Sequence, residues 1–438
     1  MTELPRILTI MGSGETTPTM ARVHRAVLDR LGERPVPAVL LDTPYGFQEN
    51  ADDITARALE YFKVNVGNPF QAASFRSSEV DSLTKETALV RMREAKLVFT
   101  GPGSPSYALR HWSGTDVPRI LARKLAEGGA VTMASAAALT LGRFTIPVYE
   151  IYKVGEAPRW LEGLDLLTPI GLPVAVVPHY DNAEGGNHDT RFCYMGERRL
   201  EMLEAELPDD VFILGVDGHT ALTLDLDAGT AAVAGLGVVT VRRSGRSTVF
   251  AAGTEMPISA IVEAAHGRSG VRVRATASTA DSASIGVDGG TPSPTGAAMP
   301  LPTHPLREEV AALERLFSTS LEDCDVPAAV KAILALDETI EAWAGDTDQS
   351  DALSNARASM RAAIVSLGEL AVDGTRDPAT VVAPFVDALL AERLRARAAR
   401  EWATADGIRD RLLAAGVELH DTPDGTTWEL RPQAPVGG

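Results

Sequence analysis

The sequence predicts an α/β domain, with a mostly parallel sheet flanked by helices, followed by a mainly helical second domain that ends in a β-hairpin. In the first 270 residues, short apolar segments typical of strands alternate with helical segments such as 21–31 and 116–125. Helical patterns dominate the chain after residue 304. The predicted parts are the α/β domain at 1–270, a linker at 271–304, a helical domain at 305–383 and a C-terminal region at 384–438.

The linker and the segments after it justify the second half of this prediction. Residues 271–304 are rich in Ser, Thr, Gly and Pro without hydrophobic periodicity, which is typical of a flexible linker. The last strand-like segments, at 417–430, enclose an Asp-Gly pair that suits a tight hairpin turn. The helical patterns between them cover 306–317, 326–343, 352–370 and 384–413, the last broken near Glu401.

Composition limits the class of protein. The chain has 438 residues, more than one ordinary hydrophobic core accommodates. Its hydrophobic content of 45% and charged content of 23% are typical of globular domains. Two cysteines, Cys193 and Cys324, do not form a disulfide framework, so we expect a reducing cytoplasm. Neither an N-terminal signal nor an apolar run long enough to span a membrane is predicted. The net charge of −18 argues against broad, non-specific nucleic-acid binding.

A serine follows the predicted strand at 129–134 and precedes a helix-forming segment. In α/β proteins a sharp strand-to-helix turn of this kind presents a nucleophilic serine, and small neighbours relieve crowding of the backbone. Ser135 is therefore a candidate nucleophile, although Met133 and Ala137 occupy the two glycine positions of the usual G-x-S-x-G pattern. An ordinary strand-to-helix turn is the alternative, because small residues are common there in parallel sheets.

A histidine ends another apolar strand-like segment, at 172–178. Active sites of open α/β sheets form at the carboxyl ends of strands, and a serine hydroxyl needs a base to become nucleophilic. We therefore predict His179 as the base. Glu150 and Asp181 compete to hold its tautomer, and spacing alone does not choose between them.

The Gly-rich turn at 101–104 follows a further predicted strand. Its backbone N–H groups are candidates to stabilise a developing oxyanion, together with the N–H of Ala136 directly after the candidate nucleophile. The alternative is an ordinary turn between strand and helix, which Gly and Pro also suit.

The loop at 179–194 is polar, broken by glycines and studded with aromatic residues. Its charged and amide side chains are candidates to bind the ammonium and carboxylate groups of a substrate, and a solvated loop is the alternative. A metal site built from His179, His188 and Asp189 matches no recognised zinc spacing, so we predict neither a metal nor a cofactor. The candidate substrate-binding residues are Asp181, Asn182, Glu184, His188 and Arg191.

Over roughly its first 265 residues, the chain resembles the cyanophycinase and dipeptidase E family of serine peptidases, which have the class I glutamine amidotransferase-like fold. The order of the Gly-rich turn, the serine, an acidic residue and the histidine carries the resemblance, with the segments 11–14, 41–44 and 215–222. The resemblance implies a peptidase or amidase that acts on a small peptide or amino-acid conjugate through an acyl-enzyme. It further implies Ser135 as nucleophile, His179 as base, Glu150 as orienting acid, and Gly103 and Ala136 beside the oxyanion.

Residues 392–428 resemble the C-terminal region of cysteinyl-tRNA synthetases, and 321–343 resemble the helical domain that precedes it there. The resemblance implies contact with tRNA near the anticodon, and aminoacylation is not expected because HIGH-like and KMSKS-like motifs are missing. The second hypothesis is therefore a tRNA-binding or RNA-binding adaptor with an inactive hydrolase-like domain. The candidate RNA-binding residues are Arg393, Arg397, Arg400 and Trp428.

Charge opposes this second hypothesis. From residue 305 onward, 13 Lys and Arg face 24 Asp and Glu, a net charge of −11, whereas neutralisation of phosphates drives RNA affinity. The arginines gather on one predicted helical hairpin and are candidates for a local basic stripe. We favour slightly the alternative that they pair at helical spacings with Glu392, Glu401, Asp406 and Asp410.

Overall fold

The computed structural model describes residues 4–183, 188–267, 274–275, 305–323, 325–345, 352–374, 378–422 and 425–431. These residues form two compact units, Met1–Arg357 and Ala358–Gly438. Glu184, Cys324 and all but two residues of the predicted linker lie outside the described residues.

Among the described residues, a nine-stranded sheet has the order β15-β14-β11-β10-β1-β5-β4-β2-β3. Neighbouring strands are parallel in the part of the sheet formed by β1, β5, β4, β2 and β3. On the other side of β1, the sheet continues through antiparallel pairs of β10, β11, β14 and β15. The strands are β1 (Arg6–Met11), β2 (Ala38–Leu41), β3 (Gln71–Ala73), β4 (Leu97–Thr100), β5 (Gly129–Ala134), β10 (Thr220–Asp225), β11 (Thr230–Gly235), β14 (Thr254–Pro257) and β15 (Arg274–Ala275).

A second sheet has the order β13-β12-β9-β8-β6-β7 among the described residues. Its central strand β8 pairs in parallel with both neighbours. The strands are β6 (Phe144–Thr145), β7 (Leu161–Glu162), β8 (Val174–Val177), β9 (Phe212–Val216), β12 (Val238–Arg243) and β13 (Arg246–Ala251).

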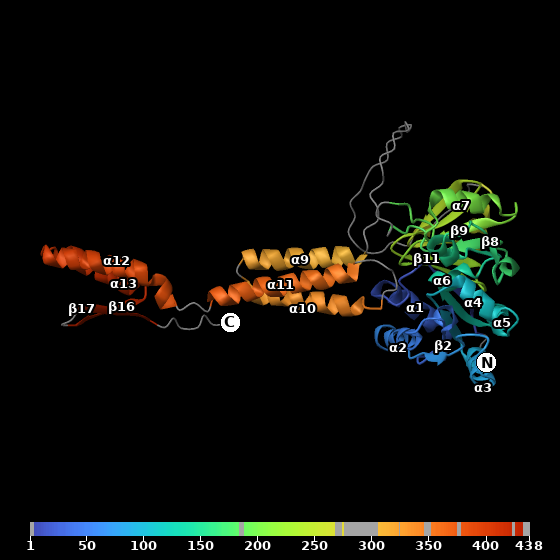
Figure 1. Cartoon of the computed structure of the whole chain (residues 1–438), viewed down its shortest axis with the longest axis horizontal. Helices are drawn as coiled ribbons and strands as arrows, with labels where there is room; N and C mark the ends of the chain where they lie inside the picture. The colour runs from blue at the N-terminus through green and yellow to red at the C-terminus, as the bar shows by residue number, and fades with distance from the viewer. Residues whose placement is uncertain are drawn as a thin grey trace, which may run out of the picture. The chain divides into compact units, whose positions relative to one another are not determined.

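Helices flank these sheets (Figure 1). Strands β2, β4, β5, β8 and β9 are buried along their whole length, which explains their continuous apolar sequences. The α-helices are α1 (Pro18–Leu31), α2 (Ala51–Tyr61), α3 (Ser82–Glu94), α4 (Pro105–Trp112), α5 (Val117–Glu127), α6 (Ser135–Leu139), α7 (Gly196–Ala205) and α8 (Ile258–Ala265). Short 3₁₀-helices are η1 (Thr43–Tyr45) and η4 (Thr168–Ile170), and short π-helices are η2 (Phe62–Val66) and η3 (Glu150–Val154).

Two helices after the linker belong to the same unit. Helices α9 (Pro305–Glu322) and α10 (Val326–Ala342) pack against each other. Trp343, at the end of α10, is fully buried and donates from Nε1 to Glu309 at 3.0 Å. Its ring lies 5.3 Å from that of His219, and the hydroxyl of Thr16 donates to the carbonyl of Gly345.

The second unit contains the C-terminal helices and hairpin. Helix α11 (Ala352–Gly374) begins in the first unit and continues into the second. Helices α12 (Pro378–Ala398) and α13 (Trp402–Ala414) precede an antiparallel hairpin of β16 (Val417–Thr422) and β17 (Gly425–Leu430). The predicted fold class is therefore confirmed: a mostly parallel sheet with flanking helices, then a helical region ending in a β-hairpin. Across the described ranges, no helix has both the length and the apolar character needed to cross a membrane.

Candidate functional site

Ser135 begins α6 directly after β5, as the sequence predicts. Its backbone φ is 50°, a left-handed conformation that costs energy for a residue other than glycine and recurs at functional sites. The strained conformation lies on the serine itself, and neither Met133 nor Ala137 has a positive φ. Both flanking side chains are fully buried. The turn therefore forms without glycine at either position.

His179 brings its imidazole to this serine. It lies two residues after the end of β8, and its Nε2 is 2.8 Å from the Ser135 Oγ. The backbone at this position is fixed, because the His179 carbonyl accepts from the N–H groups of Asn182 at 3.2 Å and Cys193 at 3.1 Å. When the hydroxyl donates in this contact, Nε2 is the unprotonated ring nitrogen. The structure thus brings together the candidate nucleophile and the candidate base.

The two residues predicted beside an oxyanion line the same cavity, of about 70 Å³, as Ser135 and His179. Gly103 has a φ of 133°, and a Cβ there would lie 2.1 Å from the Pro44 carbonyl oxygen, so the position requires glycine. Ala136 lies in the first turn of α6, where an N–H has no carbonyl partner within the helix. Both residues therefore belong to the wall of the cavity around the serine.

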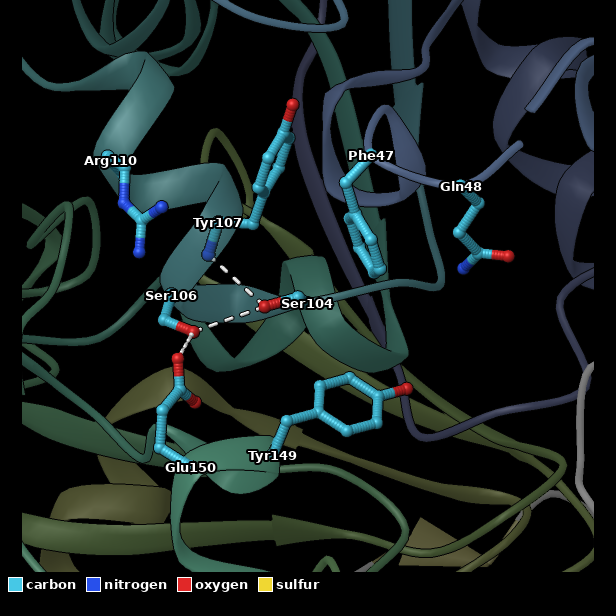
Figure 2. A pocket seen from close by; sticks show the side chains of 8 residues that line it. All are labelled: Phe47, Gln48, Ser104, Ser106, Tyr107, Arg110, Tyr149 and Glu150. Atoms are coloured by element: carbon cyan, nitrogen blue, oxygen red, sulfur yellow. Dashed lines mark hydrogen bonds between the residues drawn. The ribbon is translucent and has the colours of Figure 1, made fainter. Parts of the chain in front are cut away.

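Glu150, the predicted orienting acid, contacts Ser106. The Ser106 hydroxyl donates to Glu150 Oε1 at 2.5 Å and lies 3.1 Å from the Ser104 hydroxyl (Figure 2). Glu150 Oε2 is buried and has no hydrogen-bond partner among the described residues. Glu150 lines a neighbouring cavity of about 320 Å³, separate from the one that contains Ser135, and Tyr149 lines both.

Asp181, the competing acid, accepts a hydrogen bond from the Gly218 N–H at 2.7 Å. It also lies near Asp217, which is buried and accepts from the Val238 N–H at 2.8 Å. Burial, with the Asp181 carboxylate second, raises the pKa of Asp217 to about 7. The identity of the acid that orients His179 stays a prediction.

The predicted substrate-binding loop divides into parts with different contacts. Asn182 accepts a hydrogen bond at its backbone carbonyl from the Thr190 hydroxyl at 3.3 Å. His188 Nε2 lies 3.4 Å from the hydroxyl of Tyr152, which lines the Ser135 cavity. Glu184 lies outside the described residues.

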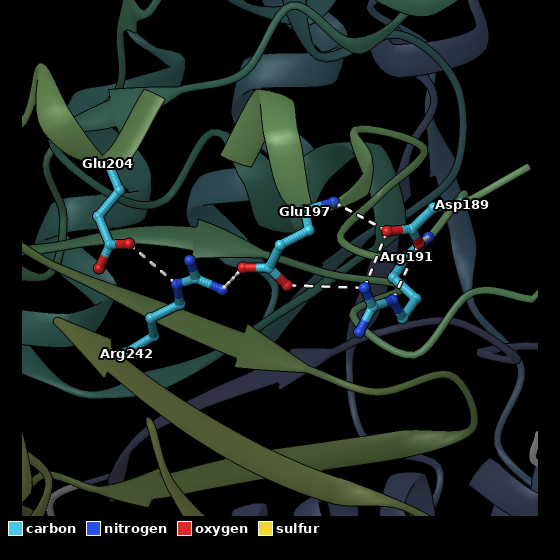
Figure 3. A network of polar contacts seen from close by, with 5 residues as sticks. All are labelled: Asp189, Arg191, Glu197, Glu204 and Arg242. Atoms are coloured by element: carbon cyan, nitrogen blue, oxygen red, sulfur yellow. Dashed lines mark hydrogen bonds and ion pairs between the residues drawn. The ribbon is translucent and has the colours of Figure 1, made fainter. Parts of the chain in front are cut away.

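Arg191 is held by acidic neighbours. It donates to both carboxylate oxygens of Asp189, at 2.9 and 2.8 Å, and lies 3.6 Å from Glu197. Figure 3 shows how Glu197 and Glu204 continue this network through Arg242. The Arg191 guanidinium holds the pKa of Asp189 well below its usual range. The charge of Arg191 is thus balanced within the protein, and its side chain does not line the Ser135 cavity.

The structure adds residues that sequence reasoning did not assign to the site. Three consecutive residues, Phe192, Cys193 and Tyr194, have φ values of 61°, 54° and 67°, and two of them enter the cavity wall. Glycine usually marks such a backbone in a sequence, and none of these residues is glycine. In the described ranges, no group of three His, Cys, Asp or Glu residues is placed to hold a metal. The further cavity residues are Pro102, Pro105, Leu139, Val148, Tyr149, Tyr152, Lys153, Cys193 and Tyr194.

The candidate RNA-binding arginines differ in their surroundings. Arg393 is buried and donates to both carboxylate oxygens of Asp421 at 2.8 Å, and Arg397 lies 3.3 Å from the same carboxylate. Arg393, with Thr426 second, lowers the pKa of Asp421. Arg400 is exposed in the turn between α12 and α13, with a φ of 63°. The acidic partners predicted from the sequence lie at helical spacings from these arginines, and Asp421 of the hairpin was not among them.

The aromatic residues of this unit also differ. Trp428 packs against the small core around Val386 and donates to Asp387 at 3.3 Å. Trp402, at the start of α13, is 58% exposed. Trp402 therefore presents more of its ring for stacking than Trp428.

The C-terminal part matches a known family. Residues 382–428 match the model described as "Cysteinyl-tRNA ligase anticodon binding domain". The cysteine–tRNA ligase of Pseudarthrobacter chlorophenolicus is 38% identical over 128 residues, 27% of this chain and 25% of that protein. That of Micrococcus luteus is 36% identical over 144 residues, 31% of this chain and 28% of that protein. The chain spans about a quarter of the length of the curated relatives it matches. The predicted resemblance of the C-terminal region is confirmed.

Two solved structures are also similar to part of this chain. "Crystal structure of a peptidase from an acI-B1 Actinobacterium" has a TM-score of 0.48 and 19% identity, and covers 58% of this chain and 98% of that chain. A putative peptidase E protein from Listeria monocytogenes EGD-e has a TM-score of 0.36 and 11% identity, and covers 56% of this chain and 98% of that chain.

Proposed function

We propose that the α/β part of this chain is a serine hydrolase, a peptidase or amidase that acts on a small peptide or amino-acid conjugate. The observation that carries the proposal is the 2.8 Å contact between Ser135 Oγ and His179 Nε2 at the carboxyl ends of β5 and β8. A serine hydroxyl becomes an effective nucleophile when such a base removes its proton. The left-handed backbone of Ser135 supports the same role, because nucleophilic serines occupy sharp turns between strand and helix.

The reaction follows from these positions. The Ser135 oxygen attacks the substrate carbonyl carbon while His179 Nε2 takes the hydroxyl proton. The N–H groups of Gly103 and Ala136 donate to the oxygen that becomes negatively charged. The tetrahedral intermediate then collapses: the carbon–nitrogen bond breaks, and the amine leaves with the proton from His179. Water, deprotonated by His179, hydrolyses the acyl-enzyme and returns the serine.

Size supports a small substrate. The cavity that contains Ser135 is small, about 70 Å³. The neighbouring cavity of about 320 Å³ shares the lining residue Tyr149 with it, and we place a longer group of the substrate there. We assign orientation of His179 to Glu150, with Asp181 as the alternative.

Fluorophosphonate labelling tests whether Ser135 is activated. We expect the wild-type protein to gain one phosphonyl group, located by peptide mass spectrometry on Ser135, and Ser135→Ala to gain none. The matched control is Ser247→Ala on β13, an exposed serine away from the cavity, which we expect to label like the wild type. Equal labelling of the wild type and Ser135→Ala contradicts the proposal, and so does an unlabelled wild type.

A second function rests on the family match at residues 382–428. We propose that the C-terminal unit associates with tRNA through the exposed residues around the α12–α13 turn, among them Arg397, Arg400 and Trp402. Exposed guanidinium groups contact phosphates, and an exposed indole stacks on an unpaired base. Fluorescence anisotropy with labelled tRNA at low salt is expected to show binding that weakens as salt rises and is lost in Arg397→Ala/Arg400→Ala. Absence of binding at low salt contradicts this function.

A further inference from the structure

A third cavity, of about 260 Å³, lies beside the turn that carries Gly103. Pro102, Gly103 and Tyr149 line both this cavity and the one that contains Ser135. A group bound in the third cavity therefore touches the same backbone turn that faces the serine. The third cavity is called the side cavity below.

One wall of the side cavity comes from a distant part of the sequence. Ala344 and Gly345, which follow α10, line it together with Thr16. The Thr16 hydroxyl donates to the Gly345 carbonyl, and a Cβ on Gly345 would lie 2.9 Å from the Thr16 carbonyl oxygen. Trp343 anchors this segment, because its ring is fully buried and contacts His219. The segment after α10 is thus closely packed against Thr16 and forms part of the cavity wall.

The side cavity has an apolar floor. Leu40 and Phe99 are almost fully buried at its base, and Ala58 and Ile54 of α2 extend this surface. An aliphatic or aromatic side chain placed there loses its contact with water, which is favourable. The floor therefore selects an apolar side chain.

Polar and charged groups surround this floor. Gln48, Asn50 and Arg57 line the cavity, and Arg57 is exposed and forms no ion pair within the described ranges. The described contact of Arg57 is a hydrogen bond from Nε to the carbonyl of Asp53 at 3.4 Å. Glu15 also lines the cavity, and its carboxylate lies near the turn that carries Gly103: a Cβ on Gly101 would lie 3.3 Å from Glu15 Oε1. The arrangement complements a molecule with an amino nitrogen near Glu15 and a carboxylate near Arg57.

We propose that the side cavity binds the leaving amino acid of the substrate: a residue with an aliphatic or aromatic side chain and a free α-carboxylate. The proposal rests on the function proposed above, since the leaving nitrogen departs from the acyl carbon on Ser135. The side chain lies on the floor, the carboxylate meets Arg57, and the released ammonium meets the Glu15 carboxylate. The segment after α10 therefore determines substrate choice in the α/β part.

Binding to an inactive variant tests the side cavity. We use full-length Ser135→Ala and measure calorimetric titrations with alanyl-leucine and alanyl-glycine. Burial of a leucine side chain predicts that alanyl-leucine binds about tenfold or more tightly than alanyl-glycine. Ser135→Ala/Ala344→Trp, which fills the cavity from an exposed position, is expected to lose that preference. The matched control Ser135→Ala/Leu334→Trp adds an indole to an exposed site on α10 outside the cavity and keeps the preference.

Arg57→Gln supplies a second variant, on a different element from the α10 segment. In Ser135→Ala/Arg57→Gln, we expect alanyl-leucine to bind severalfold more weakly, whereas alanyl-leucine amide, which has no carboxylate, binds as before. Equal affinity for alanyl-leucine and alanyl-glycine overturns the proposal, and so does an unchanged preference in the Ala344→Trp variant. Failure of fluorophosphonate labelling in wild-type protein overturns the hydrolase function instead, because the titrations need no active serine.

Discussion

Replacement of Gly103 by alanine tests the role of the turn beside the serine. A Cβ at this position would lie 2.1 Å from the Pro44 carbonyl oxygen and 2.7 Å from the Tyr45 nitrogen, both backbone atoms. Neither atom belongs to a flexible side chain, so the turn itself must move. The φ of 133° adds strain for any residue with a side chain. The backbone N–H of residue 103 therefore shifts away from the serine in Gly103→Ala.

The expected loss follows from the value of one oxyanion donor. Removal of such a donor costs a factor of about 10² to 10³ in rate, or about 3–4 kcal/mol of transition-state stabilisation. We expect the second-order rate of fluorophosphonate labelling at Ser135 to fall by about two orders of magnitude in Gly103→Ala, since the reagent's phosphoryl oxygen occupies the same position.

A matched glycine separates loss of the donor from general backbone strain. Gly171 also has a positive φ, 87°, but a Cβ there meets nothing within 4 Å. Gly171→Ala therefore carries a backbone penalty without the collision, and we expect it to label at nearly the wild-type rate. Circular dichroism and thermal unfolding of both variants check that the fold persists. A Gly103→Ala protein that labels within about threefold of the Gly171→Ala rate refutes the assignment of this turn to the oxyanion.

Three further predictions concern stability. Arg242→Met is expected to lower the free energy of unfolding by about 3–5 kcal/mol in urea titrations, because it leaves the largely buried Glu204 without its cation. A loss under about 1 kcal/mol contradicts a stabilising role for the network in Figure 3. Asp217→Asn is expected to gain stability relative to the wild type as pH rises from about 4 to about 7. The pKa of Asp217 is raised to about 7 in the folded protein, so over this range the folded wild type keeps a proton that the unfolded chain loses, and its free energy of unfolding falls. Parallel curves of the free energy of unfolding against pH for the two proteins contradict the shift. Asp421→Asn is expected to lower the unfolding temperature of the C-terminal unit at neutral pH more than the control Asp410→Asn does. Asp421 forms hydrogen bonds with Arg393 and Arg397, whereas Asp410 is exposed and has no described ion pair. Equal shifts contradict a structural role for the Asp421 carboxylate.

The sequence was most informative where the chemistry lies at the ends of strands. Ser135 after β5 and Gly103 after β4 follow neighbouring parallel strands of one sheet, whose carboxyl ends meet at the same edge. His179 follows β8 of the second sheet, so its approach to Ser135 does not follow from that rule. Ser135 and His179 are 44 residues apart in the sequence, and the structure places their Oγ and Nε2 atoms 2.8 Å apart. Ala136 and Ala137, the small residues after the serine, are both buried in the structure.

Contacts that depend on side-chain direction were not predictable in the same way. The sequence predicted Glu150 as the orienting acid, but its hydrogen bond from Ser106 joins two segments whose spacing carries no periodic signal. The pairing of Arg393 with Asp421 depends on how the terminal hairpin lies against α12, whereas sequence reasoning considered partners within the helices. The wall formed by Ala344 follows from a fold-back of the chain across more than 300 residues, and small residues there give no sign of a cavity.

The rate of fluorophosphonate labelling in His179→Ala tests whether His179 acts as the base for Ser135. Loss of a positioned general base reduces such a reaction by about 10² to 10⁴. We expect wild-type protein to be labelled at Ser135 and His179→Ala, shown to be folded by circular dichroism, to react at least about a hundredfold more slowly. Labelling of His179→Ala at the wild-type rate would contradict the assignment of His179 as the base.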